Sequence, residues 1–153
     1  PAVVLGAGGA SRAVLVALLD EGSPEIRIAN RTRKRADDLA AEINDPRITV
    51  IDWPVAPTAL ENASLVVNTT SLGMVGQPAL EIDLTGLPPS ALVTDIVYAP
   101  LMTDLLMQAK KRGNPIVDGL GMLLHQARPG FHRWFGIDPE VTQELRDFVL
   151  SPD

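Results

Sequence analysis

The sequence predicts an α/β fold in which a doubly wound, six-stranded parallel sheet lies between helices on both faces, a three-layer αβα arrangement. Short apolar runs alternate with helical patterns along all 153 residues, as expected for parallel βαβ units with right-handed crossovers. The first run, residues 3–5, ends in a glycine-rich turn that leads directly into a helical pattern. In an open sheet of this kind, a dinucleotide binds where such a turn meets the helix.

The spacing of apolar residues defines the expected elements in order. Strands are predicted at residues 3–5, 25–29, 47–51, 65–68, 92–95 and 116–117. Helices are predicted at residues 10–19, 33–43, 101–112, 119–135 and 139–150. Thr32 can cap the second helix, Gly113 ends the third, and Pro139 stands at the start of the last. Residues 53–62 predict one short helix and residues 75–89 a loop, which completes a Rossmann-like order of elements.

Composition excludes several classes of function. No apolar run approaches the length of a membrane span, and the absence of cysteine excludes disulfides and thiolate metal sites. Thirteen Lys and Arg residues against 19 Asp and Glu give a net charge of −6, which argues against general nucleic-acid affinity. We therefore expect a cytoplasmic domain without a membrane or nucleic-acid partner. Because the sequence opens on a strand at Pro1 without an initiator Met, we expect it to be part of a longer chain.

The glycine turn after the first strand predicts an anion site. N–H groups at a helix start have no internal partners, and the helix dipole favours negative charge there. Gly6 permits the tight turn, while Gly8 and Gly9 let the backbone approach a pyrophosphate closely. Ser11 stands where the usual fingerprint has its third glycine. The alternative is an ordinary strand-to-helix turn, but the strand before and the helix after favour the binding site.

The residues after the second strand favour NADP over NAD. Asn30 and Arg31 stand where NAD-binding domains usually offer a carboxylate to the adenosine ribose. A carboxylate would repel a 2′-phosphate, whereas a guanidinium can bond it in bidentate fashion. Arg33, Lys34 and Arg35 add cations at a helix N-terminus, where they oppose the dipole. A phosphate ligand explains this cluster, and the alternative is a solvated helix start.

Polar residues follow three more strands at the same edge of the sheet. Residues 68–71, Asn-Thr-Thr-Ser, can hold a ribose or nicotinamide, or can equally cap the next turn. Tyr98 can bond a polar substrate, although its spacing alone favours a half-buried packing role. Gly119 allows close approach to a flat ring, Met122 can pack against one, and Gln126 can offer an amide to substrate hydroxyls.

The chain offers no evident catalytic or metal-binding group. His125 and His132 lie seven residues apart without a second metal-type cluster, so both are interpreted as surface or packing residues and no metal is expected. No Ser or Lys is paired in the sequence with a plausible general base. We therefore expect no catalytic residue within this chain.

Five linked motifs resemble the shikimate dehydrogenase family, in that family's order. They are residues 6–13 (GAGGASRA), 30–35 (NRT with Arg35), 68–74 (NTTSLGM), 95–98 (DIVY) and 118–127 (DGLGMLLHQA). They span nearly the whole chain and match only the family's C-terminal, NADP-binding domain. The resemblance implies hydride transfer between NADPH and 3-dehydroshikimate, which gives shikimate on the chorismate pathway of aromatic amino-acid biosynthesis.

The resemblance also implies a role for particular residues. Residues 6–10 would cradle the pyrophosphate, and Arg31 and Arg35 would clamp the 2′-phosphate. Tyr98 and Gln126 would reach the substrate, so the resemblance makes both of them site residues rather than packing residues. The residues expected to bind the cofactor are Gly6, Ala7, Gly8, Gly9, Ala10, Asn30, Arg31, Thr32, Arg35, Thr70, Ser71, Ile96, Gly119 and Met122.

The family's catalytic Lys and Asp belong to an N-terminal domain, which we expect to be absent from this chain. The final helix would help join the two domains, so Leu145 or Phe148 would be exposed without that partner, and homodimer formation stays open. We expect the chain alone to bind NADP weakly and not to turn over shikimate. The alternatives are a quinate/shikimate dehydrogenase with broader substrate or cofactor use and a non-catalytic nucleotide-sensing module.

Overall fold

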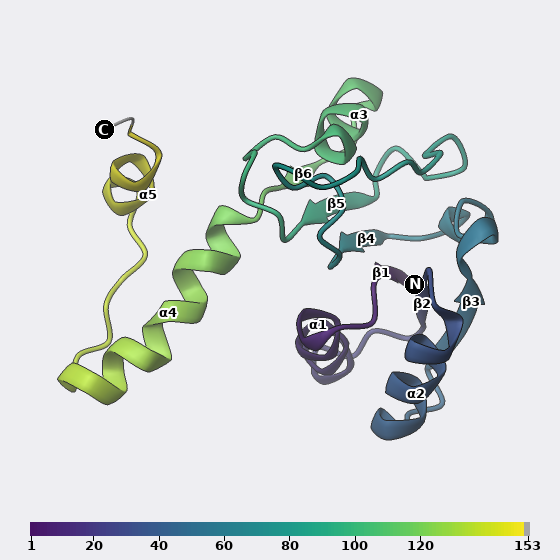
Figure 1. Ribbon diagram of the computed structural model, residues 1–153, viewed down its shortest axis with the longest axis horizontal. Helices are drawn as coiled ribbons and strands as arrows, with labels where there is room; N and C mark the ends of the chain where they lie inside the picture. The colour runs from purple at the N-terminus through teal and green to yellow at the C-terminus, as the bar shows by residue number, and fades with distance from the viewer. Residues whose placement is uncertain (152–153) are drawn as a thin grey trace.

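The computed structural model describes residues 1–151, in which six strands form one parallel sheet (Figure 1). The strands are β1 (Ala2–Leu5), β2 (Ile26–Asn30), β3 (Ile48–Asp52), β4 (Leu65–Asn68), β5 (Leu92–Asp95) and β6 (Ile116–Val117). Their order across the sheet is β3-β2-β1-β4-β5-β6, and every neighbouring pair is parallel. This is the strand order of a dinucleotide-binding sheet, with its switch point between β1 and β4. The predicted fold class is confirmed.

Helices cover both faces of the sheet, as a parallel sheet requires. They are α1 (Gly9–Asp20), α2 (Arg33–Ile43), α3 (Asp104–Arg112), α4 (Leu120–Phe135) and α5 (Gln143–Leu150). In Figure 1, α1 and α2 lie on one side of the sheet and α3 lies on the other. The segment between β4 and β5 contains no helix, so extended chain with buried leucines covers the sheet beside α3.

The alternation of side chains along β1 divides the core between the two faces. Val3 and Leu5 pack with α3 and the β4–β5 segment, whereas Val4 packs with α1 and α2. All three side chains have no exposed surface. Because successive residues of a strand point to opposite faces, this continuous apolar run is what a strand buried on both faces needs.

Two predicted helix starts are wrong, for the same physical reason. The third helix begins at Asp104 rather than residue 101, because the Thr103 hydroxyl caps it by accepting from the N–H of Leu106. The last begins at Gln143 rather than Pro139, because Thr142 caps it. Thr32 does stand at the N-cap of α2, but its side chain makes no cap hydrogen bond.

The segment after β3 forms two short 3₁₀ turns, Trp53–Val55 and Thr58–Leu60, instead of the single short helix that the sequence predicts. Each covers three residues, and Leu60 is the buried one. Prolines 54 and 57 lack the N–H that an α-helix interior needs, which limits both turns to this length. The first turn fixes Trp53 at the carboxyl end of β3.

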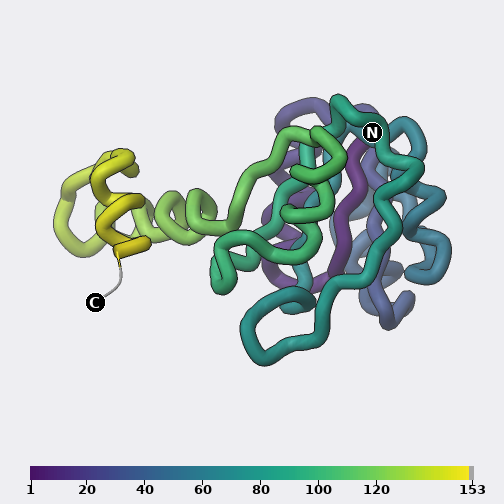
Figure 2. Tube along the Cα trace, turned by 90° about the horizontal axis from the view of Figure 1, so that it is seen from above, coloured from purple at the N-terminus to yellow at the C-terminus, as the bar shows by residue number. Residues whose placement is uncertain are grey.

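Helices α4 and α5 extend away from the sheet as an arm (Figure 2). Helix α5 has no buried residue, and the arm exposes large apolar side chains, including Trp134 and Phe148. A hydrogen-bonded ion pair between Arg146 and Asp118 ties α5 to the start of α4. Among the described residues, no helix combines the length and apolar character needed to cross a membrane.

Candidate functional site

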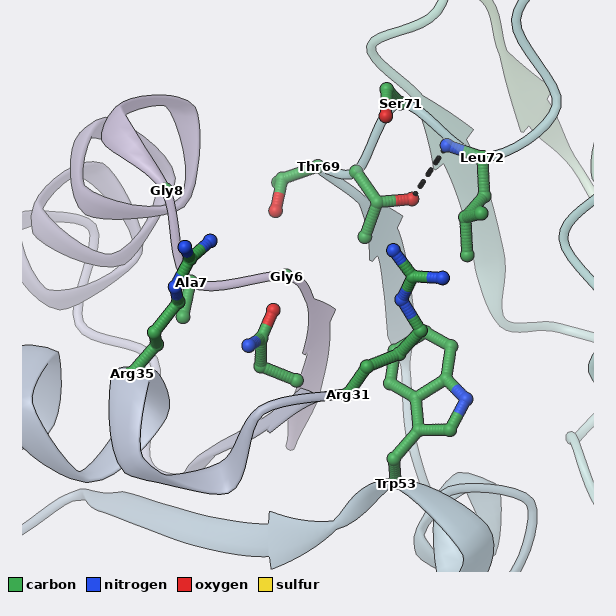
Figure 3. A pocket seen from close by; sticks show the side chains of 11 residues that line it. Gly6, Ala7, Gly8, Arg31, Arg35, Trp53, Thr69, Ser71 and Leu72 are labelled. Carbon is green, nitrogen blue, oxygen red and sulfur yellow. Dashed lines mark hydrogen bonds between the residues drawn. The ribbon is translucent and has the colours of Figure 1, made fainter. Parts of the chain in front are cut away.

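A cavity of about 300 Å³ opens at the carboxyl ends of β1 to β4 (Figure 3). Its lining comes from the glycine turn, from the residues after β2 and β3, and from the turn after β4. The residues are Gly6, Ala7, Gly8, Asn30, Arg31, Arg35, Trp53, Thr69, Thr70, Ser71 and Leu72. In open α/β sheets, ligands bind at this edge, at the point where the strand order reverses.

The glycine turn presents free main-chain donors to this cavity. Gly6 has φ +115°, and a Cβ there would lie 2.6 Å from the Thr69 hydroxyl oxygen, so only glycine fits. The first helical hydrogen bond of α1 runs from Arg12 N to Gly8 O, at 3.1 Å. The N–H groups of Gly9 and Ala10 therefore precede the helical ladder and have no partner within it. Together with the helix dipole, these donors could hold an anion, which keeps the site predicted from the sequence as a prediction.

Ser11 replaces the third glycine of the fingerprint with a hydroxyl bridge. Its side chain is fully buried, accepts a hydrogen bond from Gly8 N at 3.0 Å, and lies 2.6 Å from the Thr69 hydroxyl. The Thr69 hydroxyl also bonds the Leu5 carbonyl oxygen at 2.6 Å and must donate to it. Ser11 is therefore the donor to Thr69, and this chain of bonds joins α1 to the ends of β1 and β4.

Two of the cations at the start of α2 have carboxylate partners. Arg33 Nη1 lies 2.8 Å from an oxygen of Asp52, and Lys34 Nζ lies 2.7 Å from Asp38. All four side chains are exposed, so each pair contributes little to stability. Their presence at a helix N-terminus is explained by these partners and needs no ligand.

Arg31 and Arg35 differ from their neighbours. Both line the cavity, both are exposed, and neither forms an ion pair with a carboxylate in residues 1–151. Asn30 holds the backbone bend between them and β2, because its side-chain amide donates to the Thr32 carbonyl oxygen at 2.9 Å. The structure thus brings two uncompensated guanidinium groups to the cavity beside the predicted pyrophosphate turn (Figure 3).

The polar turn after β4 is mostly bonded to itself. Asn68 Oδ1 accepts from both the N–H and the hydroxyl of Thr70, and the Thr70 oxygen accepts from Leu72 N at 3.0 Å. The capping alternative therefore accounts for Asn68 and for the Thr70 hydroxyl. Thr70 and Ser71 still line the cavity, where the exposed Ser71 faces solvent.

A buried carboxyl connects this turn to the nicotinamide side of the predicted site. Asp95 accepts from the Asn68 amide and from Val97 N, both at 2.9 Å, and from the Thr103 hydroxyl at 2.8 Å. It is 1% exposed, and burial raises the pKa of its carboxyl, although the bond from Val97 opposes that shift. Asp95 therefore fixes the ends of β4 and β5 relative to the start of α3.

The remaining predicted residues lie on elements outside the cavity. A Cβ on Gly119 would lie 2.5 Å from the Ile96 carbonyl oxygen, so the start of α4 touches the turn after β5. Met122 and Tyr98 are 37% and 47% exposed, and Gln126 is exposed one turn beyond Met122 on α4. The structure brings Ile96 and Gly119 together and leaves the other three side chains open to solvent.

The two histidines lie on exposed positions of α4, as expected for surface residues. His132 Nδ1 is 3.1 Å from a carboxylate oxygen of Asp138. Within residues 1–151, no group of three or more His, Asp or Glu side chains is arranged to hold a metal ion.

Trp53 and Leu72 line the cavity but were not among the residues predicted from the sequence, and Trp53 is the aromatic one. It follows Asp52, which pairs in register with Asn30, so Trp53 and Arg31 emerge side by side from neighbouring strands. The signal in the sequence is an aromatic residue directly after the third strand. Using it requires the knowledge that β3 lies next to β2, which the order of elements along the chain does not state.

Two family models match the chain, in sequence order. The model described as Shikimate / quinate 5-dehydrogenase matches residues 1–75, which include the glycine turn and the basic cluster. The model described as Shikimate 5′-dehydrogenase C-terminal domain matches residues 119–143, which begin at the glycine that contacts the turn after β5. Together they cover both sides of the predicted site.

Curated relatives are similar over almost the whole chain. It is 61% identical over 151 residues to a shikimate dehydrogenase (NADP(+)) of Paramagnetospirillum magneticum, covering 99% of this chain and 54% of the relative. It is 62% identical over 149 residues to the shikimate dehydrogenase (NADP(+)) of Dinoroseobacter shibae, with coverages of 97% and 53%. The chain therefore spans about half the length of these relatives.

Solved structures share the fold. A quinate dehydrogenase from Corynebacterium glutamicum in complex with NAD superposes with a TM-score of 0.86 at 30% identity, covering 97% of this chain and 54% of that one. A shikimate 5-dehydrogenase from Thermus thermophilus in complex with NADP(H) and shikimate gives 0.77 at 37% identity, with coverages of 92% and 51%. One of these neighbours therefore holds NAD and the other NADP(H), which differ in the 2′-phosphate.

Proposed function

Because the chain belongs to the shikimate dehydrogenase family, we propose that it is the NADP-binding domain of such an enzyme. The whole protein would transfer a hydride between NADPH and 3-dehydroshikimate, giving shikimate for aromatic amino-acid biosynthesis. One observation carries the cofactor assignment: two guanidinium groups that find no carboxylate partner within residues 1–151 line the same cavity as the glycine turn. This combination suits a dinucleotide that carries a pyrophosphate and, on its adenosine ribose, an additional 2′-phosphate.

The pyrophosphate would bind at the glycine turn. The N–H groups of Gly9 and Ala10 provide donors in a fixed direction, and Gly8 leaves space for the ligand because nothing lies within 4 Å of a Cβ built there. The dipole of α1 adds a favourable field for the negative charge. These donors are part of the folded backbone, so they need no rearrangement on binding.

The 2′-phosphate would bind between Arg31 and Arg35. Both guanidinium groups are exposed to the cavity, and each can form paired, charge-assisted bonds to phosphate oxygens. NAD has a hydroxyl at this position and would gain less from the two cations. We therefore assign NADP as the cofactor, with Asn30 and Thr32 shaping the loop that carries Arg31.

The nicotinamide would lie at the other end of the switch point, beside Ile96, Gly119 and Met122. The cofactor supplies the hydride there, and this chain's residues orient the ring. Tyr98 and Gln126 extend from the adjoining turn and from α4, where they can hydrogen-bond the substrate. The groups that exchange a proton with the substrate would come from an N-terminal catalytic domain outside this chain. We place the whole protein in the cytoplasm.

Quinate oxidation is the second candidate function. The family model includes quinate in its description, and the Corynebacterium quinate dehydrogenase shares the fold. Substrate discrimination would depend on the catalytic domain, so the present residues favour NADP without selecting between quinate and shikimate. The exposed apolar residues of α4 and α5, Trp134 and Phe148 among them, would pack against that domain or against a second copy in a homodimer.

Calorimetric titration of the chain with NADPH and with NADH tests the cofactor assignment. We expect NADPH to bind at least tenfold more tightly, and we expect Arg31→Ala to remove most of that difference. Lys34→Ala is the matched control, because this neighbouring cation pairs with Asp38 and does not line the cavity. Equal affinities for the two nucleotides in the unaltered chain would contradict the assignment.

A further inference from the structure

Trp53 occupies a fixed position on the wall of the cavity. Its partly buried side chain packs against the core cluster that contains Val3 and Leu5, and it also lines the cavity, as Arg31 does. The 3₁₀ turn that begins at Trp53 closes with a bond from Ala56 N to the Trp53 carbonyl oxygen at 3.1 Å. Packing and turn together hold an aromatic face at this edge without any ligand.

The position of this face relative to the phosphate sites decides what it can contact. Arg31 follows β2 and Trp53 follows β3, and the last paired residues of these strands are Asn30 and Asp52. The aromatic ring therefore lies on the outer side of the predicted 2′-phosphate site, away from β4 and β5. A group stacked on it must be attached to the ribose that carries the 2′-phosphate.

The turn after β4 contributes further residues to this cavity. Leu72 lines it, together with Thr70. The lining thus combines an indole, a guanidinium and an apolar side chain, from Trp53, Arg31 and Leu72 (Figure 3). Planar groups of this kind stack well on a purine, which has a π-face but no charge.

We propose that Trp53 is the aromatic wall of the adenine subsite and that it determines affinity for the base independently of the 2′-phosphate. This assignment rests on the proposed nucleotide-binding function. Arg31 and Trp53 then divide the recognition of the adenosine end: the guanidinium selects the phosphate and the indole holds the base. The nicotinamide would not contact this ring, because it would lie beside Ile96 and Gly119, which follow β5 and β6.

Two variants of Trp53 test this role by calorimetry. Trp53→Leu keeps an apolar side chain for the core but removes the aromatic ring. Trp53→Phe keeps an aromatic ring that is smaller than the indole. We expect the leucine variant to bind adenosine 2′,5′-bisphosphate about tenfold more weakly and the phenylalanine variant to recover most of the affinity. The ratio of NADPH to NADH affinity should be the same in the leucine variant as in the unaltered chain, because the base is common to both.

Fluorescence gives an independent readout in a Trp134→Phe background, which leaves Trp53 as the single tryptophan. Trp134 lies on α4 and is 80% exposed, so its replacement is the matched control and should leave affinity unchanged. Saturating adenosine 2′,5′-bisphosphate should quench Trp53 emission, since a stacked purine changes the environment of the ring. This probe has no nicotinamide, so energy transfer to a reduced ring cannot cause the signal.

The outcomes separate this inference from the proposed function. Unchanged affinity in a folded Trp53→Leu variant, or unchanged Trp53 emission during measured binding, would overturn the role of Trp53 while NADP binding stands. Absence of any NADPH binding to the unaltered chain would overturn the proposed function and this assignment with it. Thermal unfolding of each variant shows whether a loss of binding comes from a loss of folded protein.

Discussion

The hydroxyl oxygens of Ser11 and Thr69 lie 2.6 Å apart in the buried space between α1 and the ends of β1 and β4. Dinucleotide-binding turns usually keep a glycine at the Ser11 position so that helix and strand pack closely. Here the close contact is a hydrogen bond that also orders the turn after β4. The serine that replaces the usual glycine therefore connects the glycine turn to the turn after β4.

Replacement of Ser11 by alanine should lower the free energy of unfolding by roughly 1–3 kcal/mol, because Gly8 N–H loses its acceptor and the Thr69 hydroxyl oxygen loses its donor in a buried site. Urea unfolding measures the change. Ser90→Ala is a matched control at an exposed position and should stay within about 0.5 kcal/mol of the unaltered chain. Equal stability of the Ser11 and Ser90 variants would show that the bridge contributes nothing.

Replacement of Gly119 by alanine should destabilise the chain by about 1–3 kcal/mol, because the new Cβ would lie 2.5 Å from two main-chain carbonyl oxygens and the backbone must move. The same substitution at Gly121 meets nothing within 4 Å and should stabilise α4 by up to about 1 kcal/mol. Thermal or urea unfolding distinguishes the two. A neutral Gly119→Ala variant would mean that the turn after β5 is looser than the structure shows.

Replacement of Asp95 by asparagine should change how stability depends on pH. Burial raises the pKa of this carboxyl above its ordinary 3.8, so the folded chain holds the proton more tightly than the unfolded chain does. Its favourable contribution is fully present below about pH 3.8 and is lost as the pH rises through the raised pKa of the folded state.

The difference in the free energy of unfolding, variant minus unaltered chain, should therefore rise with pH across that window and then level off. Urea unfolding at several pH values from 3 to 8 measures it. A difference that falls as the pH rises would mean that the bonds from Asn68, Val97 and Thr103 outweigh burial and lower the pKa instead.

Much of the fold could be predicted because apolar periodicity depends on local sequence. The bounds of β4, β5 and β6 match the structure, since each is a short apolar run that ends at or just before a polar residue. The starts of α3 and α5 could not be predicted as well. Thr103 and Thr142 determine them through side-chain bonds, whereas Leu101 and Pro139 offered equally plausible starts.

The candidate site was predicted only where one motif supplies the residues. The glycine turn and Arg31 are examples, because each follows its own strand directly. The Lys34–Asp38 pair has a spacing of four residues on one helix, which the sequence shows. The Arg33–Asp52 pair could not be read from the sequence, because Asp52 ends β3 and Arg33 begins α2. Trp53 was missed for the same reason, because its neighbour in space is 22 positions away in the printed sequence.

The contact at Gly119 also affects the direction in which α4 leaves the sheet. Helix α4 has 16 residues and is therefore about 24 Å long, with its fixed end at the sheet and its far end in solvent. A tilt of about 10° at the fixed end would sweep the far end through about 4 Å, given that length. The close contact that glycine allows at residue 119 therefore constrains the direction of α4. Through that direction it also constrains the position of the aromatic side chains at the far end of the helix.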